Sequence, residues 1–600
     1  MDDQNKNLIL ATVLSFLVIL AWFFLFPPEE PTIQPVLPEL SQGTGETAPT
    51  ADVAAGVAPA APETAPTPVA ESVRIPIDTP RLIGSVALTG GRIDELALRD
   101  YRAELDSPDS VPLLKPIGSE GAYYAQFGWA PGGDMTWDDV PGAETPWTVA
   151  GRPTLTIETP LVLTWANSTG QIFTRTIAVD ENFLFTITQS IENSAGTDIR
   201  LAPYSALKRH GEPQDLTGFF VIHEGPVRQS GEEMTEFDYG DMVKFDADER
   251  WGANAEVLEV QQNGWLGFTD HYWMTTLVPA ANSPFTSVLK YNETSDVYSA
   301  EARGKTLTIA AGSTGAVTTQ LFAGAKEWDT IRDYERDDGI YKFIDSIDWG
   351  WFFFLTKPIF SVLHWLNGLI GNMGWSIIGL TLLIKALLFP LAYKSYVSMA
   401  KMKELQPEMQ KLKEKAGDDR AKLQQEMMQL YKKEKVNPAS GCLPIILQIP
   451  IFFSLYKVIF VTIELRHAPW FGWIRDLSSP DPSSILNLFG LLPYAVPGPG
   501  SVFAILSLGI LPILLGISMW LQQKLNPAPT DATQAMIFAW MPWVFMFMLG
   551  SFASGLVVYW IANNTITFTQ QYLIMRSQGY NPNVFGNITS SFKRKKPPEK

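Results

Sequence analysis

The sequence predicts an α-helical polytopic membrane protein with six transmembrane helices, five of them in one core, and an inserted all-β sandwich domain. Leu8–Phe26 forms one uncharged apolar run, and apolar stretches dominate again from Trp351 to Met575. The interval between these two parts is acidic and alternates apolar with polar residues, which is typical of antiparallel sheets. The mean hydropathy of +0.04 therefore averages a membrane part and an aqueous part.

Composition excludes several functional classes. The formal net charge of -18 argues against nucleic-acid binding by the whole chain, because duplex binders need clustered cations. Cys442 is the only cysteine, which rules out an intramolecular disulfide and a thiolate metal cluster. The sequence has no G-x-x-x-x-G-K-[ST] motif and no G-x-G-x-x-G after a strand, so directly ATP-driven transport is disfavoured. We expect no metal and no cofactor.

Residues 1–27 are predicted to form an N-terminal transmembrane anchor. Its apolar run would span about 28 Å as a helix, enough to cross the hydrocarbon core. Lys6 precedes the run and two glutamates follow it, an arrangement that keeps the amino terminus cytoplasmic. A cleaved signal peptide is the alternative, but no small-x-small cleavage site directly follows. Residues 28–72 are rich in Pro, Ala, Thr and Glu and are predicted to be a disordered tether.

Residues 73–345 are predicted to form the β-sandwich domain. Segments such as "QIFTRTIAV", "FLFTITQSIEN" and "GAVTTQLFAG" alternate with period two and are separated by Gly, Asn, Asp and Pro. The acidic stretch "EWDTIRDYERDDGIYKFID" is predicted to close the domain as a short helix. Residues 351–371 follow as an aromatic-rich amphipathic helix, which we expect to lie in the membrane interface rather than to cross it.

The five-helix membrane core is predicted to occupy residues 372–575. The loop after its first crossing is rich in lysine, and the tail of residues 576–600 is also basic, so both are predicted to be cytoplasmic. The crossings are expected at 372–392, 441–463, 502–523, 535–550 and 552–573.

Within the lysine-rich loop, residues 395–438 are predicted to fold as an antiparallel helical hairpin. Apolar residues recur at spacings of three and four on both sides of "AGDD", which predicts two helices with a narrow apolar seam. A solvated charged linker is the alternative. The seam residues expected to contact a substrate or partner are Met399, Met402, Leu405, Met409, Met427 and Leu430.

The soluble domain offers no convincing catalytic group. "SVLK", residues 287–290, matches S-x-x-K, but its surroundings alternate as a strand, whereas a serine–lysine dyad needs a helix start. His210, His223 and His271 form no metal-ligand spacing. We therefore predict that the protein is not an enzyme, although a sugar-binding cleft with aromatic walls stays open.

Polar residues inside the predicted crossings are the most informative features. Lys385 is the one charge in "GLTLLIKALLFPLAY", Thr381 lies on the same helix face, and Gln448 lies in the next crossing. On the last crossing, polar residues recur at spacings of four, four and three: Tyr559, Asn563, Thr567 and Gln570. Such groups avoid lipid, so we expect them to share a wet cavity. Snorkelling of Lys385 to the cytoplasmic headgroups is the alternative.

Several segments resemble the YidC/Oxa/Alb family of membrane insertases, in the form found in Gram-negative inner membranes. The resemblance covers Trp351–Lys600, and the anchor, tether and β-rich domain have the expected order. It is carried by "VSMAKMKELQPEMQKLKEK", "QEMMQLYKKEKVNPASGCLPIILQIPIFFSLYKV", "ELRHAPWFGWIRDLSSPDP" and "MPWVFMFMLGSFASGLVVYWIANN".

This resemblance implies an insertase and chaperone that moves hydrophobic segments of nascent inner-membrane proteins into the phospholipid bilayer. It would act alone or with the Sec translocon, without nucleotide hydrolysis and without a small-molecule substrate. The resemblance also implies both termini in the cytoplasm and a periplasmic β-domain of the β-supersandwich type.

The family's hydrophilic groove carries one cation, normally arginine, and Lys385 occupies the matching position. Lysine keeps the charge but lacks the planar five-donor fork of arginine. The other residues expected to line the groove are Thr381, Gln448, Trp560 and Asn563. The tail residues expected to approach ribosomal RNA are Lys593, Arg594, Lys595 and Lys596. Phe489–Phe503 departs from the family as an enlarged outer segment, either a loop or a re-entrant segment.

Two other functional classes are weighed against the insertase. An ion-coupled transporter should show inverted repeats and membrane carboxylates, but the last five predicted crossings contain no Asp or Glu. A membrane-tethered sugar-binding module should lose its function when the β-domain is removed, whereas an insertase should not.

Overall fold

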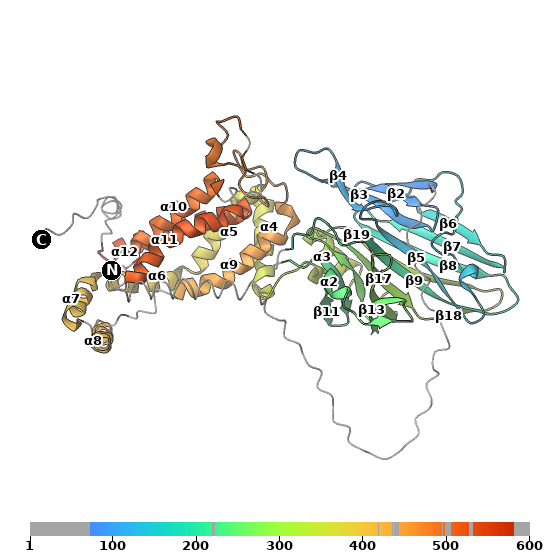
Figure 1. The fold of residues 1–600 in the computed structure, drawn as a ribbon, viewed down its shortest axis with the longest axis horizontal. Coiled ribbons are helices and arrows are strands. Elements are labelled where there is room, and N and C mark those ends of the chain that lie inside the picture. Colours follow the sequence, from blue (N-terminus) through green and yellow to red (C-terminus); the bar gives the residue numbers. More distant parts are fainter. Residues whose placement is uncertain are drawn as a thin grey trace, which may run out of the picture.

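A β-sandwich and a helical core lie end to end in the computed structural model of the chain (Figure 1). The predicted anchor, nearly all of the predicted tether and the four basic tail residues lie outside the part that is described. The structure describes residues 72–218, 222–417, 419–434, 436, 443–494, 496–497, 506–526 and 532–580.

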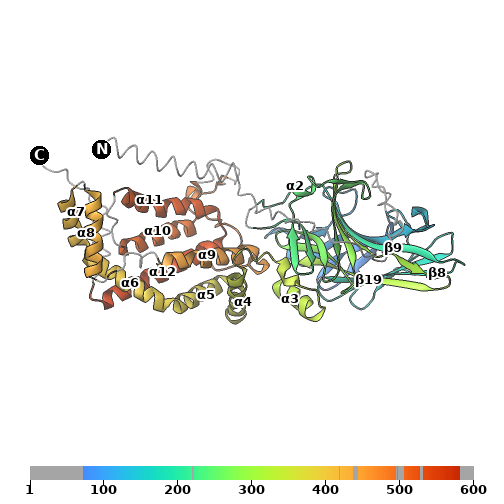
Figure 2. The same ribbon diagram turned by 90° about the horizontal axis from the view of Figure 1, so that it is seen from below.

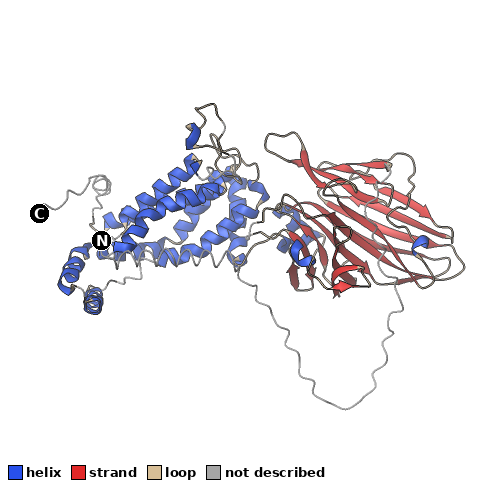
Figure 3. Cartoon of the chain, viewed as in Figure 1, coloured by secondary structure: helices blue, strands red, loops and turns tan. Residues whose placement is uncertain are grey.

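Two sheets form the β part (Figure 3), and all pairings between their strands are antiparallel. In the described residues, the eleven-stranded sheet has the order β1-β2-β3-β5-β9-β17-β16-β13-β12, with β18 on β9 and β4 on β3. The eight-stranded sheet has the order β11-β10-β14-β15-β19-β8-β7-β6. The strands of the first sheet are β1 (Arg74–Asp78), β2 (Leu82–Ala87), β3 (Arg92–Arg102), β4 (Ser110–Leu114), β5 (Tyr123–Gly132), β9 (Ile199–His210), β12 (Ala247–Asp248), β13 (Ala253–Val260), β16 (Phe285–Asn292), β17 (Val297–Gly304) and β18 (Leu307–Ile309). Those of the second are β6 (Leu161–Ala166), β7 (Gln171–Val179), β8 (Leu184–Asn193), β10 (Gly225–Ser230), β11 (Glu233–Glu236), β14 (Trp265–Thr269), β15 (Trp273–Pro279) and β19 (Thr314–Ala325).

The alternation in the sequence explains the sandwich. On β7, Phe173 and Ile177 are fully buried while Ile172, next to Phe173, is exposed, because successive side chains point to opposite faces. The predicted all-β sandwich is confirmed. The "SVLK" segment lies within β16, and the acidic stretch forms α3 (Trp328–Asp337) and a short 3₁₀ helix (Phe343–Ser346), as predicted.

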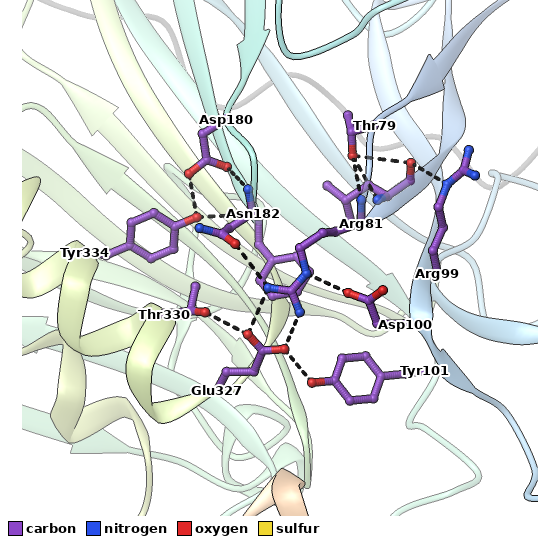
Figure 4. A network of polar contacts seen from close by, with 12 residues as sticks. Thr79, Arg81, Arg99, Asp100, Tyr101, Asp180, Asn182, Glu327, Thr330 and Tyr334 are labelled. Atoms are coloured by element: carbon purple, nitrogen blue, oxygen red, sulfur yellow. Dashed lines mark hydrogen bonds and ion pairs between the residues drawn. The ribbon is translucent and has the colours of Figure 1, made fainter. Parts of the chain in front are cut away.

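A polar network ties α3 to the sandwich (Figure 4). The Arg81 guanidinium donates two hydrogen bonds to Glu327, one of them 2.9 Å long, and another of 3.1 Å to Asn182. Tyr101 donates to the same Glu327 carboxylate, and the Thr330 hydroxyl donates to it at 2.7 Å. One carboxylate therefore joins β3, α3 and the chain before β2.

The helical core holds the amphipathic segment, the membrane helices and the hairpin. The hairpin helices lie at the end of the core opposite the sandwich in both views (Figures 1 and 2). The helices are α4 (Phe353–Ile370), α5 (Met373–Leu387), α6 (Phe389–Glu404), α7 (Gln406–Ala416), α8 (Arg420–Lys433), α9 (Leu443–Val461), α10 (Ile510–Leu525), α11 (Ala532–Met548) and α12 (Ser554–Ser577).

The predicted crossing 372–392 is not one straight helix. α5 ends at Leu387, α6 begins at Phe389, and the two are bent by 69°. Pro390 explains the break, because its ring clashes with the carbonyl four residues earlier and it has no N–H to donate. α6 then runs on to Glu404, so the hairpin of α7 and α8 begins later than the predicted position 395.

Among the described helices, α4 is long and apolar enough by itself to cross a membrane. The bent pair α5–α6 is long and apolar enough if it counts as one span. The apolar segments Ile446–Val461, Ile510–Leu525 and Ala535–Ser551 are shorter. The count of six crossings and the interfacial position of α4 therefore stay predictions.

The sandwich and the core meet through specific polar contacts around α4 and α9. Asp329 lies 2.9 Å from His364 Nε2 on α4, and Asp348 lies 2.5 Å from Lys457 Nζ on α9. The His271 Nε2–H donates to the carbonyl of Phe460 over 2.8 Å, and its ring stacks on the Phe460 ring. These contacts fix the domain to the end of α9.

We predict that Arg81→Ala lowers the free energy of unfolding by about 2–3 kcal/mol, because it strands the largely buried Glu327. Arg99→Ala is the matched control, since Arg99 and its partner Asp78 are 37% and 63% exposed. That loss should stay below about 1 kcal/mol. Urea unfolding of the full-length protein in detergent, followed by tryptophan fluorescence, measures both. Equal losses would contradict the role assigned to this network.

A second prediction concerns pH. Burial lowers the pKa of His271 from 6.5 to about 4, so the docked ring is neutral at pH 7. A freed ring takes up a proton below pH 6.5, whereas the docked ring does so only near pH 4. Docking should therefore weaken as the pH falls from 6.5 to 4, by at most about 3 kcal/mol, and stay constant above pH 7.

Protease accessibility of the domain–core junction across pH 4–8 measures this weakening. His271→Gln is the control, because the amide can donate to Phe460 but does not titrate. If the variant and the wild-type protein show the same pH profile, another group causes it.

Candidate functional site

The centre of the helical core is α12, which packs against α5, α6, α9 and α10. In Figure 2, α12 runs beside α10, and α5 also packs against α12. Tyr559, Asn563 and Thr567 on α12 are therefore buried among the helices. This position gathers the residues that the sequence singles out.

A chain of hydrogen bonds links three of these helices. Lys385 Nζ on α5 donates to Gln448 Oε1 on α9 over 3.1 Å, and Gln448 Nε2 donates to the Tyr559 hydroxyl on α12 over 2.6 Å. Lys385 and Gln448 are half-buried and Tyr559 is buried. Within the described residues, no carboxylate lies within ion-pair distance of Lys385. A cation thus lies among helices with an amide as its partner.

The remaining predicted groove residues occupy distinct positions around this chain. Thr381 is 1% exposed, and its hydroxyl donates to the Ile377 carbonyl over 2.7 Å, so it contributes to helix packing. Asn563 and Thr567 are buried on α12, and Asn563 Oδ1 and Thr567 Oγ1 have no hydrogen-bond partner among the described residues. Buried polar atoms of this kind are normally satisfied, and water in a groove would do so.

Trp560 forms an aromatic wall next to the polar chain. Its ring centroid lies 4.6 Å from that of Phe452 on α9 and 5.8 Å from that of Phe545 on α11. It therefore bridges three helices on the side where α9 and α11 carry exposed apolar side chains such as Phe453 and Val544.

Sequence reasoning missed a second set of polar contacts, between α12 and α10. Asn564 Nδ2 donates to Ser518 Oγ and Gln571 Nε2 donates to Asn526 Oδ1, each over 3.1 Å. The spacing of seven between Asn564 and Gln571 is the signal that could have found them, because it places both on one face. Gln571 is 1% exposed and is thus the buried glutamine of α12.

The hairpin seam agrees with the prediction except at one end. Met409 and Leu430 are buried, and the Tyr431 hydroxyl lies 4.0 Å from the Met409 sulfur. Met402, Leu405 and Met427 are half-buried.

Met399 is a correction to that seam. It packs with Tyr396 and with Ile574 of α12, because α6 continues past the predicted start of the hairpin.

The enlarged segment 489–503 is described only in part, with a 3₁₀ turn before it and residues 495 and 498–503 outside the described part. Whether it is a loop or a re-entrant segment stays a prediction.

A sandwich domain fixed to a helical core with a partly buried cation defines a membrane protein with a large extramembrane domain. Family comparisons agree with this class. The model described as "YidC periplasmic domain" matches residues 74–362, and the model described as "60Kd inner membrane protein" matches residues 365–581. The chain belongs to the YidC family of membrane protein insertases.

Relatives match over the whole length. A protein of Dinoroseobacter shibae, named membrane protein insertase YidC, is 66% identical and covers 100% of both chains. A protein of Ruegeria pomeroyi with the same name is 64% identical and covers 99% of both. A crystal structure titled as an active YidC insertase with its first transmembrane domain resolved shows 17% identity, covers 84% of this chain and 93% of its own, and has a TM-score of 0.35.

These findings confirm the family resemblance and show that the protein is an insertase rather than an enzyme. They also confirm the inner-membrane location with a periplasmic domain. The ion-coupled transporter and the sugar-binding module find no support. The roles of individual site residues stay predictions.

We predict that the polar stripe of α12 contacts water. In a Cys442→Ser background, Asn563→Cys should react with a small charged thiosulfonate at least 10-fold faster than Ile566→Cys, because thiols react as thiolates, which form only in water. Reaction rates are measured by mass spectrometry in native membranes, with denatured protein as the control in which both sites react. Equal rates in the native protein would argue against a wet groove.

Proposed function

We propose that the insertase moves hydrophobic segments of nascent membrane proteins into the bilayer through a hydrated groove. The polar centre of this groove is formed by Lys385, Gln448 and Tyr559. The observation that supports this proposal is the hydrogen-bond chain across α5, α9 and α12. Charged groups at membrane depth are expensive and are normally retained for function. The process needs no nucleotide hydrolysis and no cofactor.

The charge of Lys385 attracts the polar flank of an arriving segment. An ammonium group has three donors, and Gln448 accepts one of them, which leaves two for water or for a substrate carboxylate. A carboxylate about 4 Å away would be held by about 4 kcal/mol at an effective dielectric constant of about 20. Lysine acts here as a point charge, so any single acidic or carbonyl oxygen is sufficient.

Release into lipid follows from the apolar surface beside the groove. Exposed side chains on α9 and α11 include Ile449, Phe453, Trp540 and Val544, next to the aromatic wall of Trp560. Each Å² of apolar substrate surface that leaves water for lipid contributes about 25 cal/mol. A segment that is sufficiently apolar therefore moves from the groove to the bilayer, while Asn563 keeps the inner wall polar.

The same proposal covers topology and partners. Six crossings with both termini in the cytoplasm place the hairpin and the basic tail at the side where ribosomes work. The hairpin seam of Met402, Leu405, Met409, Met427 and Leu430, extended by Met399 on α6, would receive the nascent chain, alone or with the Sec translocon. The tail would contact ribosomal RNA through its clustered cations, Lys593, Arg594, Lys595 and Lys596.

Depletion of the protein and rescue by variants tests the central role of Lys385. Lys385→Arg should restore insertion of a single-span substrate with an acidic periplasmic flank, because the cation remains. Lys385→Ala should lower insertion at least 10-fold. The readout is protease protection of the substrate flank, normalised to the amount of each variant.

Lys433→Ala is the matched control, since this hairpin lysine is 76% exposed. A chain lacking residues 73–325 tests the domain while retaining α3. Full rescue by Lys385→Ala would show that the lysine only snorkels and that groove shape or hydration suffices. Failure of the domain deletion alone would shift the function towards the β-domain.

A further inference from the structure

The back of α12 borders a cavity that the proposed insertion route does not use. Its volume is about 350 Å³, and it lies between α5, α10, α12 and the segment that follows α9. Side chains around it include Ile378, Leu514, Val558 and Ala562. The cavity thus lies within the membrane part of an inner-membrane protein.

This cavity is separate from the polar stripe of α12. Val558, Ala562 and Thr565 recur at spacings of four and three on one stripe, whereas Asn563 and Thr567 lie on another stripe of the helix. α12 therefore has a polar side towards the proposed groove and an apolar side towards this cavity.

The cavity wall is almost entirely apolar. Thr565 is the one lining residue with a hydroxyl side chain, and that hydroxyl donates to the Ile561 carbonyl over 2.7 Å within α12. Trp470 Nε1 is the one buried lining nitrogen without a hydrogen-bond partner in the described residues. Water finds few partners in such a place, so hydrocarbon fits the wall better than water does.

An aromatic cluster fixes the depth of the cavity. Trp375, Trp470, Phe471 and Trp473 lie together, with neighbouring ring centroids 4.3 to 6.5 Å apart. Tryptophans concentrate at the headgroup level of membranes. The segment that carries three of these rings also bonds the sandwich, where Arg475 pairs with Asp106 at 2.8 Å. This end of the cavity therefore lies at the periplasmic headgroups.

The lining continues into the lipid-facing surface of the protein. Leu382 on α5 and Leu514 on α10 are 52% and 44% exposed, while Leu511 and Val558 deeper in the cavity are buried. Because the surface of a membrane core at this depth faces acyl chains, the cavity is an inward extension of the interface between protein and lipid.

Shape favours a lipid chain over a protein segment. The space of about 350 Å³ lies between packed helices. A helix with side chains is about 10–12 Å across, whereas an alkyl chain is far thinner and flexible. An alkyl chain can therefore reach the buried Leu511 and Val558 without moving the helices.

We propose that this cavity binds one acyl chain of a phospholipid from the periplasmic leaflet, with its headgroup at the level of Trp375 and Trp473. The site goes beyond the proposed insertion route, because none of its residues belongs to the groove. A bound chain fills the space between α5 and α10 and supports the back of α12 while the polar side works.

Photolabelling tests the site directly. Full-length protein is reconstituted into vesicles of phosphatidylethanolamine and phosphatidylglycerol that contain a trace of phosphatidylethanolamine with a diazirine at mid-chain. After illumination, labelled peptides are quantified by mass spectrometry. We expect label on the peptides that carry Leu382, Leu514 and Ala562 to exceed that on lipid-facing α11 at least fivefold.

Two filling variants and one control make the test specific. Ala562→Phe should lower this labelling at least fivefold, and Leu514→Trp, from the opposite wall, should do the same if the first variant is poorly folded. Ala539→Phe adds the same bulk to an exposed position on α11 and should change nothing.

Even labelling of all lipid-facing helices, or enriched labelling that both filling variants leave unchanged, would overturn the proposal. Displacement of the label by a substrate segment would assign the cavity to protein instead. The insertion assay with Lys385 variants fails or succeeds separately, so the two proposals are distinguishable.

Discussion

The structure of the core depends on how a cation is accommodated among membrane helices. Lys385 meets no carboxylate in the described residues, and its partner is the neutral amide of Gln448. An amide can accept from the ammonium and donate onward at the same time, which is what Gln448 does towards Tyr559. A carboxylate in its place would neutralise the charge. The arrangement therefore keeps a net positive charge between the helices and spreads its hydrogen bonds over three of them.

α9, the helix that carries Gln448, also contacts the β part. Lys457 and Phe460, near the end of α9, are bonded to Asp348 and His271 of the β part. Lys457 lies about 13 Å beyond Gln448 along the helix. The contact at one end of α9 therefore limits rotation of the other end, where Gln448 must face both Lys385 and Tyr559.

Sequence could predict those features that depend on local periodicity. The alternation in β7 gives a half-buried strand, and the spacing of Tyr559, Asn563 and Thr567 gives a polar stripe on α12. Contacts between distant segments could not be predicted. Periodicity shows which residues share one face of a helix, but it does not show which other helix that face contacts. The pairing of Gln448 with both Lys385 and Tyr559 is such a contact.

Two helices differ from the predicted helix boundaries for identifiable reasons. Pro390 lies inside an apolar run that hydropathy reads as one span, yet it bends the chain by 69° between α5 and α6. Met399 fits the heptad-like spacing of the hairpin, yet α6 extends through it and buries it against Ile574. In both cases the same apolar pattern is compatible with two different helix boundaries. Backbone sterics determine the boundary at Pro390, and packing determines it at Met399. Local patterns therefore predict which polar residues belong to the site, whereas their arrangement depends on the bend, on the position of α9 and on the central place of α12.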